Sequence, residues 1–272
     1  MIENCIQEEI CNFLNNKEIT HCCENYDDAL NEYLNYLDRW IIAKKRKVIL
    51  SKEIEEAQKT NESIFYFIRL FEEGADVNGH LSRKICDSDY YDKLLTHWCI
   101  HHIHLNTKEA HSNSEMKKNR SDMLLFFLVA DDFVFFIDVE RHDKECVFSM
   151  YKLLCIIKYN WPFLMQKIPV VSVPKENVIT RDEDFQKLFK ANINYFISFE
   201  NDLYMLSFGS TLAGTSLENR LLINNIKKKL WLIFKNQKNT ISEMKVELLY
   251  PHREPLMKIS WIENGITKEE YV

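Results

Sequence analysis

The residues best suited to chemistry in this sequence are histidines. Six of the nine lie between residues 97 and 142, and four of these stand in the apolar stretch HWCIHHIHLN, residues 97–106. Imidazole exchanges protons near neutral pH and also binds metals. Side chains alternate between the two faces of a strand, so His102 and His104 share one face, whereas His101 lies on the other face and is expected to pack in the core.

A second polar set follows a later apolar run, in the stretch FVFFIDVERHD. Asp138, Glu140 and His142 are spaced by two residues and therefore share a face of the predicted strand, while Arg141 points to the opposite side. Polar faces at the ends of neighbouring strands would converge on one site.

One interpretation of these residues is a metal-dependent hydrolase whose metal site is formed by His102, His104 and His142. A His-x-His pair with a third imidazole leaves one coordination position open for water. The sequence has no Cys-x-x-Cys pair and no His-Glu-x-x-His helix to support it. The competing interpretation is that these imidazoles are hydrogen-bonded structural groups.

The favoured interpretation is RNA cleavage that needs neither a metal nor another cofactor. Attack by the RNA 2′-hydroxyl requires a base, an acid and a cation beside the phosphate. The expected catalytic residues are His142, Glu140, Arg120 and Arg141. The expected RNA-binding residues are Lys108, Lys117, Lys118, His102 and His104.

The segment from LLTHWCIHHIHL through NRSDMLLFFLVADDFVFFIDVERHD, roughly residues 90–143, resembles the core of bacterial RelE/YoeB-like messenger-RNA interferases. In this resemblance Arg120 takes the place of the family's phosphate-binding arginine and His142 that of its C-terminal catalytic histidine. It implies a toxin-like ribonuclease of the bacterial cytoplasm. The expected partners are RNA, which would be bound at the ribosome, and an antitoxin-like protein.

This chain departs from that family in three respects. It is long and acidic where the toxins are small and basic, Asp143 follows the histidine where an aromatic residue is expected, and the loop before Arg120 is longer. The chain also resembles a class of uncharacterised bacterial proteins of similar length, which implies no activity.

Composition narrows the alternatives. With 272 residues, 46% of them hydrophobic, the chain can bury a substantial core, and a net charge of −6 argues against a generally basic nucleic-acid-binding surface. The eight cysteines are expected to be reduced thiols, and no apolar run reaches the roughly 20 residues of a membrane helix. We therefore expect a cytoplasmic protein with no membrane partner.

Periodicity predicts the elements that position the site. Apolar residues spaced by three and four predict a helix from about residue 25 to Ile41 and a second one in the segment ESIFYFIRLFEEG, residues 62–74, with Gly74 as its C-cap. The charged block KKRKVILSKEIEEAQK is expected to form a solvated helix face. The runs at 98–105, 122–130 and 132–143 predict a β-meander with a tight turn at Asp131–Asp132.

Further along the chain, the pattern predicts a helix over 147–164, a helix capped by Thr180, a hairpin turning at Asn201–Asp202, and a helix opening at Ser216. Asp87, Ser88 and Asp89 are expected N-caps of a short helix before the histidines. Two strands around a proline-containing turn are expected near the C-terminus.

The fold class is therefore α+β. The expected order is a helical N-terminal region at 1–75, a central RelE-like α+β domain with an antiparallel meander at 76–166, and a small α+β domain at 167–272. A different function for this architecture is a non-catalytic module, in which the acidic N-terminal helices bind a protein partner.

Overall fold

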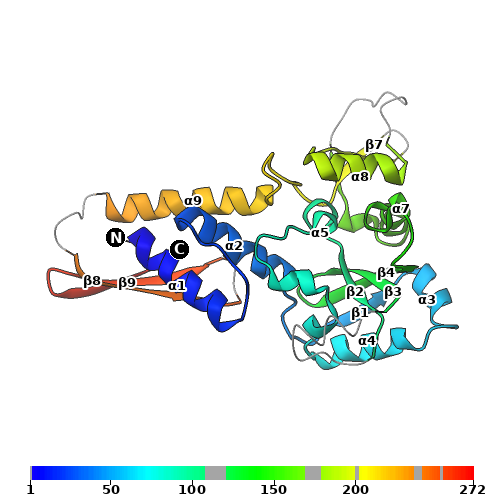
Figure 1. Ribbon diagram of the computed structural model, residues 1–272, viewed down its shortest axis with the longest axis horizontal. Helices are drawn as coiled ribbons and strands as arrows, with labels where there is room; N and C mark the ends of the chain where they lie inside the picture. Colours follow the sequence, from blue (N-terminus) through cyan, green and yellow to red (C-terminus); the bar gives the residue numbers. More distant parts are fainter. Residues whose placement is uncertain (1, 108–120, 169–178, 200–201, 236–240, 252–253) are drawn as a thin grey trace. The chain divides into compact units, whose positions relative to one another are not determined.

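The computed structural model describes residues 2–107, 121–168, 179–199, 202–235, 241–251 and 254–272. The chain forms two compact units, and each is built from segments that are far apart in the sequence (Figure 1). Unit 1 contains residues 1–40, 84–91 and 217–272, and unit 2 contains residues 41–83 and 92–216.

A mixed four-stranded sheet lies at the centre of unit 2, in the order β1-β4-β3-β2. Its strands are β1 (Lys47–Leu50), β2 (His101–His104), β3 (Met123–Val129) and β4 (Phe133–Arg141). Strands β2, β3 and β4 pair antiparallel in sequence order. The predicted meander, including the turn before Phe133, is confirmed.

The fourth strand was not predicted. Residues 47–50 pair parallel with β4, so the charged block is divided between a strand and the short helix α3 (Lys52–Ala57). Arg46 is buried and donates hydrogen bonds to the carbonyl oxygens of Ala130 (3.1 Å) and Ile42 (2.7 Å). The expectation of one solvated helix was wrong, because the block contains an apolar strand that pairs with β4, a segment distant in sequence.

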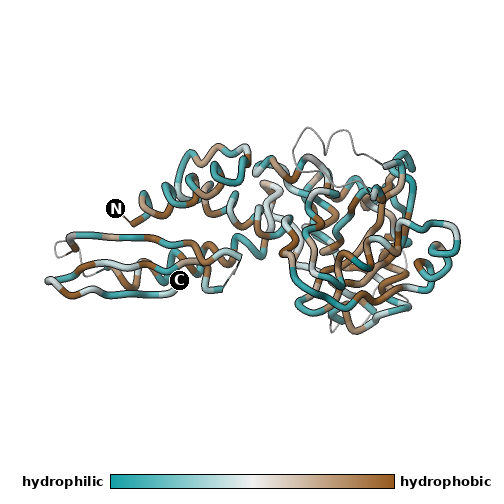
Figure 2. The backbone as a smooth tube through the Cα atoms, turned by 90° about the horizontal axis from the view of Figure 1, so that it is seen from below, coloured by the Kyte–Doolittle hydropathy of each residue, from teal (hydrophilic) through white to brown (hydrophobic). Residues whose placement is uncertain are grey.

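Both faces of this sheet are covered by helices. On one face Phe71 of α4 (Ser63–Glu73) packs against Phe127 and Phe136, with ring centroids 5.4 and 5.7 Å apart. On the other face Phe126 shares a core with helices α5 (Lys93–Trp98) and α7 (Tyr151–Asn160). Residues 124–128 of β3 and 134–137 of β4 are accordingly buried, and hydrophobic segments gather inside this unit in Figure 2.

Local signals predicted one of three helix ends correctly. Helix α4 ends at Gly74, whose φ of 77° is left-handed, as predicted. Helix α5 is capped by Asp92, which accepts from the Leu95 amide at 3.2 Å, so the caps expected at residues 87–89 were wrong. Helix α8 (Asp182–Ala191) begins after Arg181 with no side-chain cap, and Thr180 is not its N-cap.

The rest of unit 2 contains a small three-stranded sheet, the helix α8 and short 3₁₀ turns. The sheet order is β5-β7-β6, formed by β5 (Gln166–Ile168), β6 (Ile197–Phe199) and β7 (Asp202–Met205). The antiparallel pairing of β6 with β7 confirms the predicted hairpin, although Asp202 belongs to β7, where it pairs with Phe199, and not to the turn. The 3₁₀ turns are η1 (Asn78–His80), η2 (Arg83–Cys86, which extends into unit 1), η3 (Val147–Ser149) and η4 (Pro162–Leu164).

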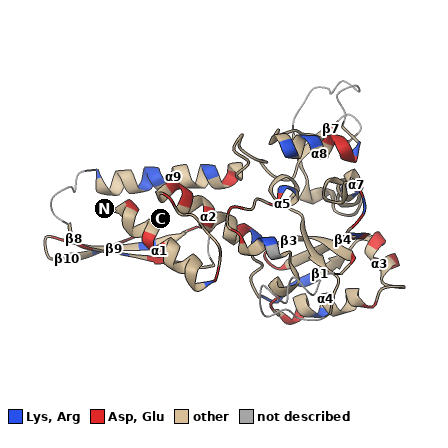
Figure 3. Cartoon of the chain, viewed as in Figure 1, with Lys and Arg blue, Asp and Glu red and all other residues tan. Residues whose placement is uncertain are grey.

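Unit 1 packs three helices with an antiparallel sheet. The helices are α1 (Ile2–Asn16), α2 (Tyr26–Arg39) and α9 (Leu217–Phe234), and the sheet has the order β10-β9-β8, with β8 (Ile241–Leu248), β9 (Met257–Glu263) and β10 (Ile266–Tyr271). Basic residues are spread along α9 and lie beside acidic residues of α2 (Figure 3). Asp27 pairs there with Lys227 at 2.5 Å and with Arg220 at 3.4 Å.

The division into units differs from the three consecutive domains expected from the sequence. The apolar faces of α1 and α2, represented by Ile10 and Leu34, share one core with Ile226 of α9 and Trp261 of β9. Partners so distant in sequence cannot be read from local periodicity. None of the helices in the described ranges combines the length and the apolar content needed to cross a bilayer.

Candidate functional site

A β-bulge in β4 creates the polar face that forms the candidate site. Phe136 pairs with Phe127 and Asp138 pairs with Phe126, so Ile137 is an extra residue in the register. The extra residue reverses the alternation of β4, and Asp138 and Glu140 therefore lie on the face that carries His102 and His104. Without it, the carboxylates would point to the opposite side of the sheet.

Ser51, which directly follows the neighbouring strand β1, makes two hydrogen bonds to this bulge. Its buried hydroxyl donates to the Ile137 carbonyl at 2.6 Å, and its amide donates to the Phe136 carbonyl at 3.0 Å. The same hydroxyl accepts from the Ile54 amide and caps α3. One side chain thus satisfies the carbonyl of the extra residue and begins the helix that follows β1.

His102 is a buried member of the polar face. Its Nδ1 lies 3.6 Å from a carboxylate oxygen of Asp92, which is too long for a direct hydrogen bond. Its ring lies 4.9 Å from the ring of Phe148. Burial lowers the pKa of His102, and the nearby Asp92 offsets this only in part. His102 is therefore a neutral imidazole at pH 7.

His104 and His142 form a stacked pair across the end of the sheet. Their ring centroids are 5.5 Å apart with an interplanar angle of 19°. Nδ1 of the buried His104 lies 3.0 Å from the Ser121 carbonyl, a hydrogen bond in which the ring donates. His142 is exposed at the open side of the pair, and its amide donates to the Asp122 carbonyl at 2.7 Å. The buried ring of His104, fixed by its hydrogen bond, thus packs against the exposed ring of His142.

The two carboxylates of this face are both paired with lysine. The buried Asp138 binds Lys152 at 2.7 Å, and Glu140 binds Lys144. Burial raises the pKa of Asp138, and Lys152 only partly offsets it. Partial burial also raises the pKa of Glu140, but the hydrogen bonds from Lys144 and the Arg141 amide outweigh it and leave the pKa below its ordinary value.

Arg141 lies on the opposite face of β4, as its position in the strand predicted. Its guanidinium makes a bidentate pair with Asp143, with contacts of 2.9 and 2.7 Å. This pair uses two of the five guanidinium N–H groups, so the role of Arg141 at the phosphate stays a prediction.

The predicted phosphate and RNA contacts cannot be placed in the same way. Arg120, Lys117, Lys118 and Lys108 all lie outside the described residues. The site is therefore defined by its imidazoles and carboxylates.

Two further histidines have packing roles. His101 stacks on Phe127 with centroids 5.6 Å apart, as expected for a packed histidine. His97 stacks on Phe189 at 4.7 Å. Burial lowers the pKa of His101 to about 3 and that of His97 to about 4, so both rings are neutral.

The metal interpretation of the histidine face finds no support in the geometry. Potential ligand atoms of at least three residues approach within 4.8 Å in two groups of the described residues, and neither group contains His102, His104 or His142. The rings of His104 and His142 are stacked, so the lone pairs of their nitrogen atoms lie in nearly parallel planes and do not point toward one metal position.

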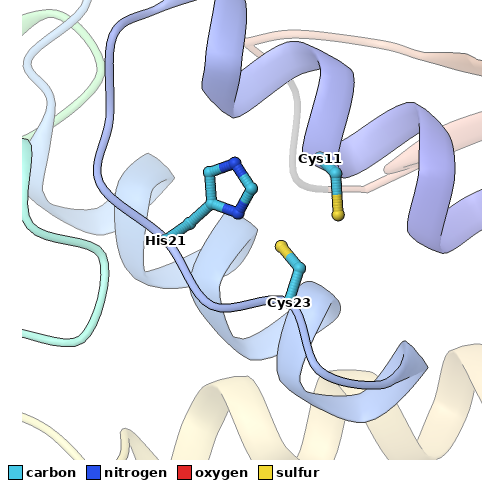
Figure 4. A group of neighbouring side chains, drawn as sticks. All are labelled: Cys11, His21 and Cys23. Atoms are coloured by element: carbon cyan, nitrogen blue, oxygen red, sulfur yellow. The ribbon is translucent and has the colours of Figure 1, made fainter.

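Sequence reasoning missed both of these groups, one of which contains Cys22, Glu32 and Asp89. Cys11, His21 and Cys23 of unit 1 approach one another, with ligand atoms within 4.8 Å (Figure 4). The closely spaced His21-x-Cys23 pair was the available signal. Its third member comes from α1 and is brought near by tertiary folding.

No protein-family model, curated protein or solved structure matches this chain, and none identifies a RelE/YoeB-like family.

Proposed function

We propose that the polar face of β2 and β4 cleaves RNA by metal-independent acid–base chemistry. The observation that carries this proposal is the bulge at Ile137, which brings two carboxylates to the face of the paired imidazoles. Bulges beside active sites commonly redirect side chains in this way. The resemblance to messenger-RNA interferases supports the same substrate, and the proposal places the reaction in the cytoplasm.

In the proposed reaction the RNA 2′-oxygen attacks the adjacent phosphorus and loses its proton to a base. The bond from phosphorus to the 5′-oxygen then breaks, and the leaving oxygen takes a proton from an acid. His142 is the exposed imidazole that moves these protons, and Glu140 is the neighbouring carboxylate that serves as base or orients it. The products are a 2′,3′-cyclic phosphate and a 5′-hydroxyl.

Paired variants of His142 test this role. His142→Ala should lower the rate of RNA cleavage by about 10²–10⁴-fold, the usual contribution of a positioned proton-transfer group. His142→Phe preserves a ring that can stack on His104 but cannot move a proton, so its rate should fall equally. Glu145→Gln changes an exposed neighbour and should leave the rate unchanged.

The assays should include a free RNA and a messenger RNA on translating ribosomes, because the resemblance implies ribosome association. Circular dichroism should confirm the fold of each variant. Full activity in His142→Phe would show that the ring only packs, and would refute the catalytic role.

A protein-binding role is the second candidate, and the outer face of α9 favours it. Trp231 and Leu232 are 63% and 49% exposed there, beside Lys228 and Lys229. Large apolar side chains on a surface often mark an interface. Absence of cleavage in both RNA assays, together with a stable complex that Trp231→Ala abolishes, would favour this role over catalysis.

A further inference from the structure

The group formed by Cys11, His21 and Cys23 lies wholly within unit 1, whereas the described residues of the proposed RNA site belong to unit 2. Cys11 is in the second half of α1, and His21 and Cys23 are in the connection that leads to α2. In Figure 4 the two sulfur atoms and one ring nitrogen are directed toward the same small space. Cys23 is buried, and the other two residues are half-buried.

The histidine of this group has one ring nitrogen without a partner. Nδ1 of His21 is buried and accepts no hydrogen bond, while Nε2 lies 3.1 Å from Oδ1 of Asn15. An amide oxygen accepts only from a protonated nitrogen, so Asn15 selects the tautomer with a proton on Nε2. That tautomer leaves a lone pair on Nδ1. A metal-bound histidine is normally held by such a hydrogen bond from its second nitrogen.

The backbone separates the two adjacent cysteines. Cys23 has a left-handed φ of 45°, and its sulfur is grouped with Cys11. The exposed Cys22 instead lies 3.3 Å from a carboxylate oxygen of Asp89. The buried Glu32 accepts hydrogen bonds from the amides of both cysteines and fixes this part of the connection.

The chemistry of the three ligands selects the class of metal. Two thiolates and one imidazole form a set that zinc accepts, with a fourth position left for water. Ligand atoms in a tetrahedral zinc site are about 3.5–3.8 Å apart, as follows from metal–ligand bonds of about 2.0–2.3 Å. The present group, within 4.8 Å, needs a contraction of about 1 Å. Small side-chain rotations provide it.

We propose that Cys11, His21 and Cys23 bind one zinc ion that ties α1 to the connection before α2. Binding releases the two thiol protons and forms two metal–sulfur bonds and one metal–nitrogen bond. Because protons compete with the metal for both sulfur atoms, zinc affinity should fall as the pH falls.

The test uses the full chain, purified under reducing conditions without a polyhistidine tag and dialysed against zinc. Mass spectrometry of the elements should find about one zinc per chain, because such sites are normally well occupied. Cobalt in place of zinc should give a thiolate-to-metal charge-transfer band in the near ultraviolet. Cys11→Ser and Cys23→Ser should each lose the metal and the band.

Two matched controls separate ligation from a general effect on folding. Cys22→Ser removes the adjacent exposed thiol and should retain full zinc binding. Asn15→Ala leaves all three ligands in place and should weaken zinc binding by about 10–100-fold, as loss of an outer hydrogen bond commonly does. Asn16→Ala should not.

Each outcome is decisive. Less than about 0.1 equivalent of zinc in the reduced wild-type chain would overturn the proposal, because a formed site of this kind is well occupied. Equal zinc in the Cys22→Ser and Cys23→Ser variants would also overturn it. A Cys11–Cys23 disulfide in chain isolated without oxygen would show that the pair is a redox couple and not a zinc site.

Discussion

At the scale of single residues, burial divides the histidines into two kinds. His97, His101 and His102 are held neutral inside unit 2, whereas His142 is exposed beside its partner His104. The proposed proton transfer therefore depends on one accessible ring. The buried rings contribute to stability and to its dependence on pH.

The buried histidines predict that acid destabilises unit 2. The unfolded chain binds protons on these rings below a pH of about 6.5, while the folded chain does not until the pH approaches its lowered pKa. The free energy of unfolding should therefore fall from pH 6.5 toward pH 4. For His101, whose pKa is about 3, the loss between pH 7 and pH 5 is about 1–2 kcal/mol.

Urea unfolding at pH 7 and pH 5 measures this effect. His101→Phe keeps a ring stacked on Phe127 and removes the titrating group, so it should reduce the loss of stability between the two pH values. Phe127→Leu disturbs the same contact without removing a titrating group and should leave the pH dependence as in the wild type. An identical pH dependence in wild type and His101→Phe would contradict the assignment.

At the scale of elements, the site depends on one irregularity in β4. Ser51 bonds the carbonyl of the extra residue Ile137 at 2.6 Å and caps α3. Ser51→Ala should lower the free energy of unfolding by about 2 kcal/mol, since it leaves a buried carbonyl unpaired. It should also slow RNA cleavage, because the bulge determines the face on which Glu140 lies.

Gly74→Ala is the control for a purely structural loss. A Cβ at Gly74 would lie 2.7 Å from the Lys45 amide nitrogen, and its φ of 77° disfavours a side chain, so a loss of about 2 kcal/mol or more is expected. The three atoms nearest to that Cβ belong to Lys44 and Lys45, which are not part of the bulge. Well below the melting temperature, Gly74→Ala should cleave RNA at the wild-type rate. If Ser51→Ala and Gly74→Ala cleave RNA at equal rates, the bulge is not required for activity.

The elements that could be predicted from the sequence are those with a strong local pattern. The meander, the end of α4 at Gly74 and the opening of α9 after Ser216 were predicted correctly. Strand β1 was missed because its four residues lie among charges and pair with a distant strand. No glycine or proline marks the bulge at Ile137. The sequence therefore predicted that the polar faces of β2 and β4 converge, but it did not predict the bulge that makes them do so.

At the scale of the whole molecule, unit 1 joins both ends of the chain. Ile10 of α1 and Leu34 of α2 share a core with Ile226 of α9 and Ile259 of β9. These segments should therefore unfold together. The sequence could not reveal this, because 177 residues lie between the end of α2 and the start of α9, the helix that it contacts.

Hydrogen exchange in low concentrations of denaturant tests this organisation. Amides of α1, α2 and α9 should become exposed with one common free energy of opening, distinct from that of β1 and α4. Ile226→Ala should lower that free energy for α1 and α2 by about 2–4 kcal/mol and leave β1 and α4 unchanged. Joint exposure of α1, α2, β1 and α4 would instead support one helical region over residues 1–75.

The central claim concerns the reaction at the polar face, and the substrate's own 2′-hydroxyl tests it most directly. The wild-type chain is incubated with EDTA and an RNA, or with the same RNA carrying a single 2′-deoxy substitution at the cleaved position, both free and on translating ribosomes. The account predicts cleavage of the RNA to a 2′,3′-cyclic phosphate and none at the substituted position. Cleavage at the deoxy position, or intact RNA in every assay, would contradict it.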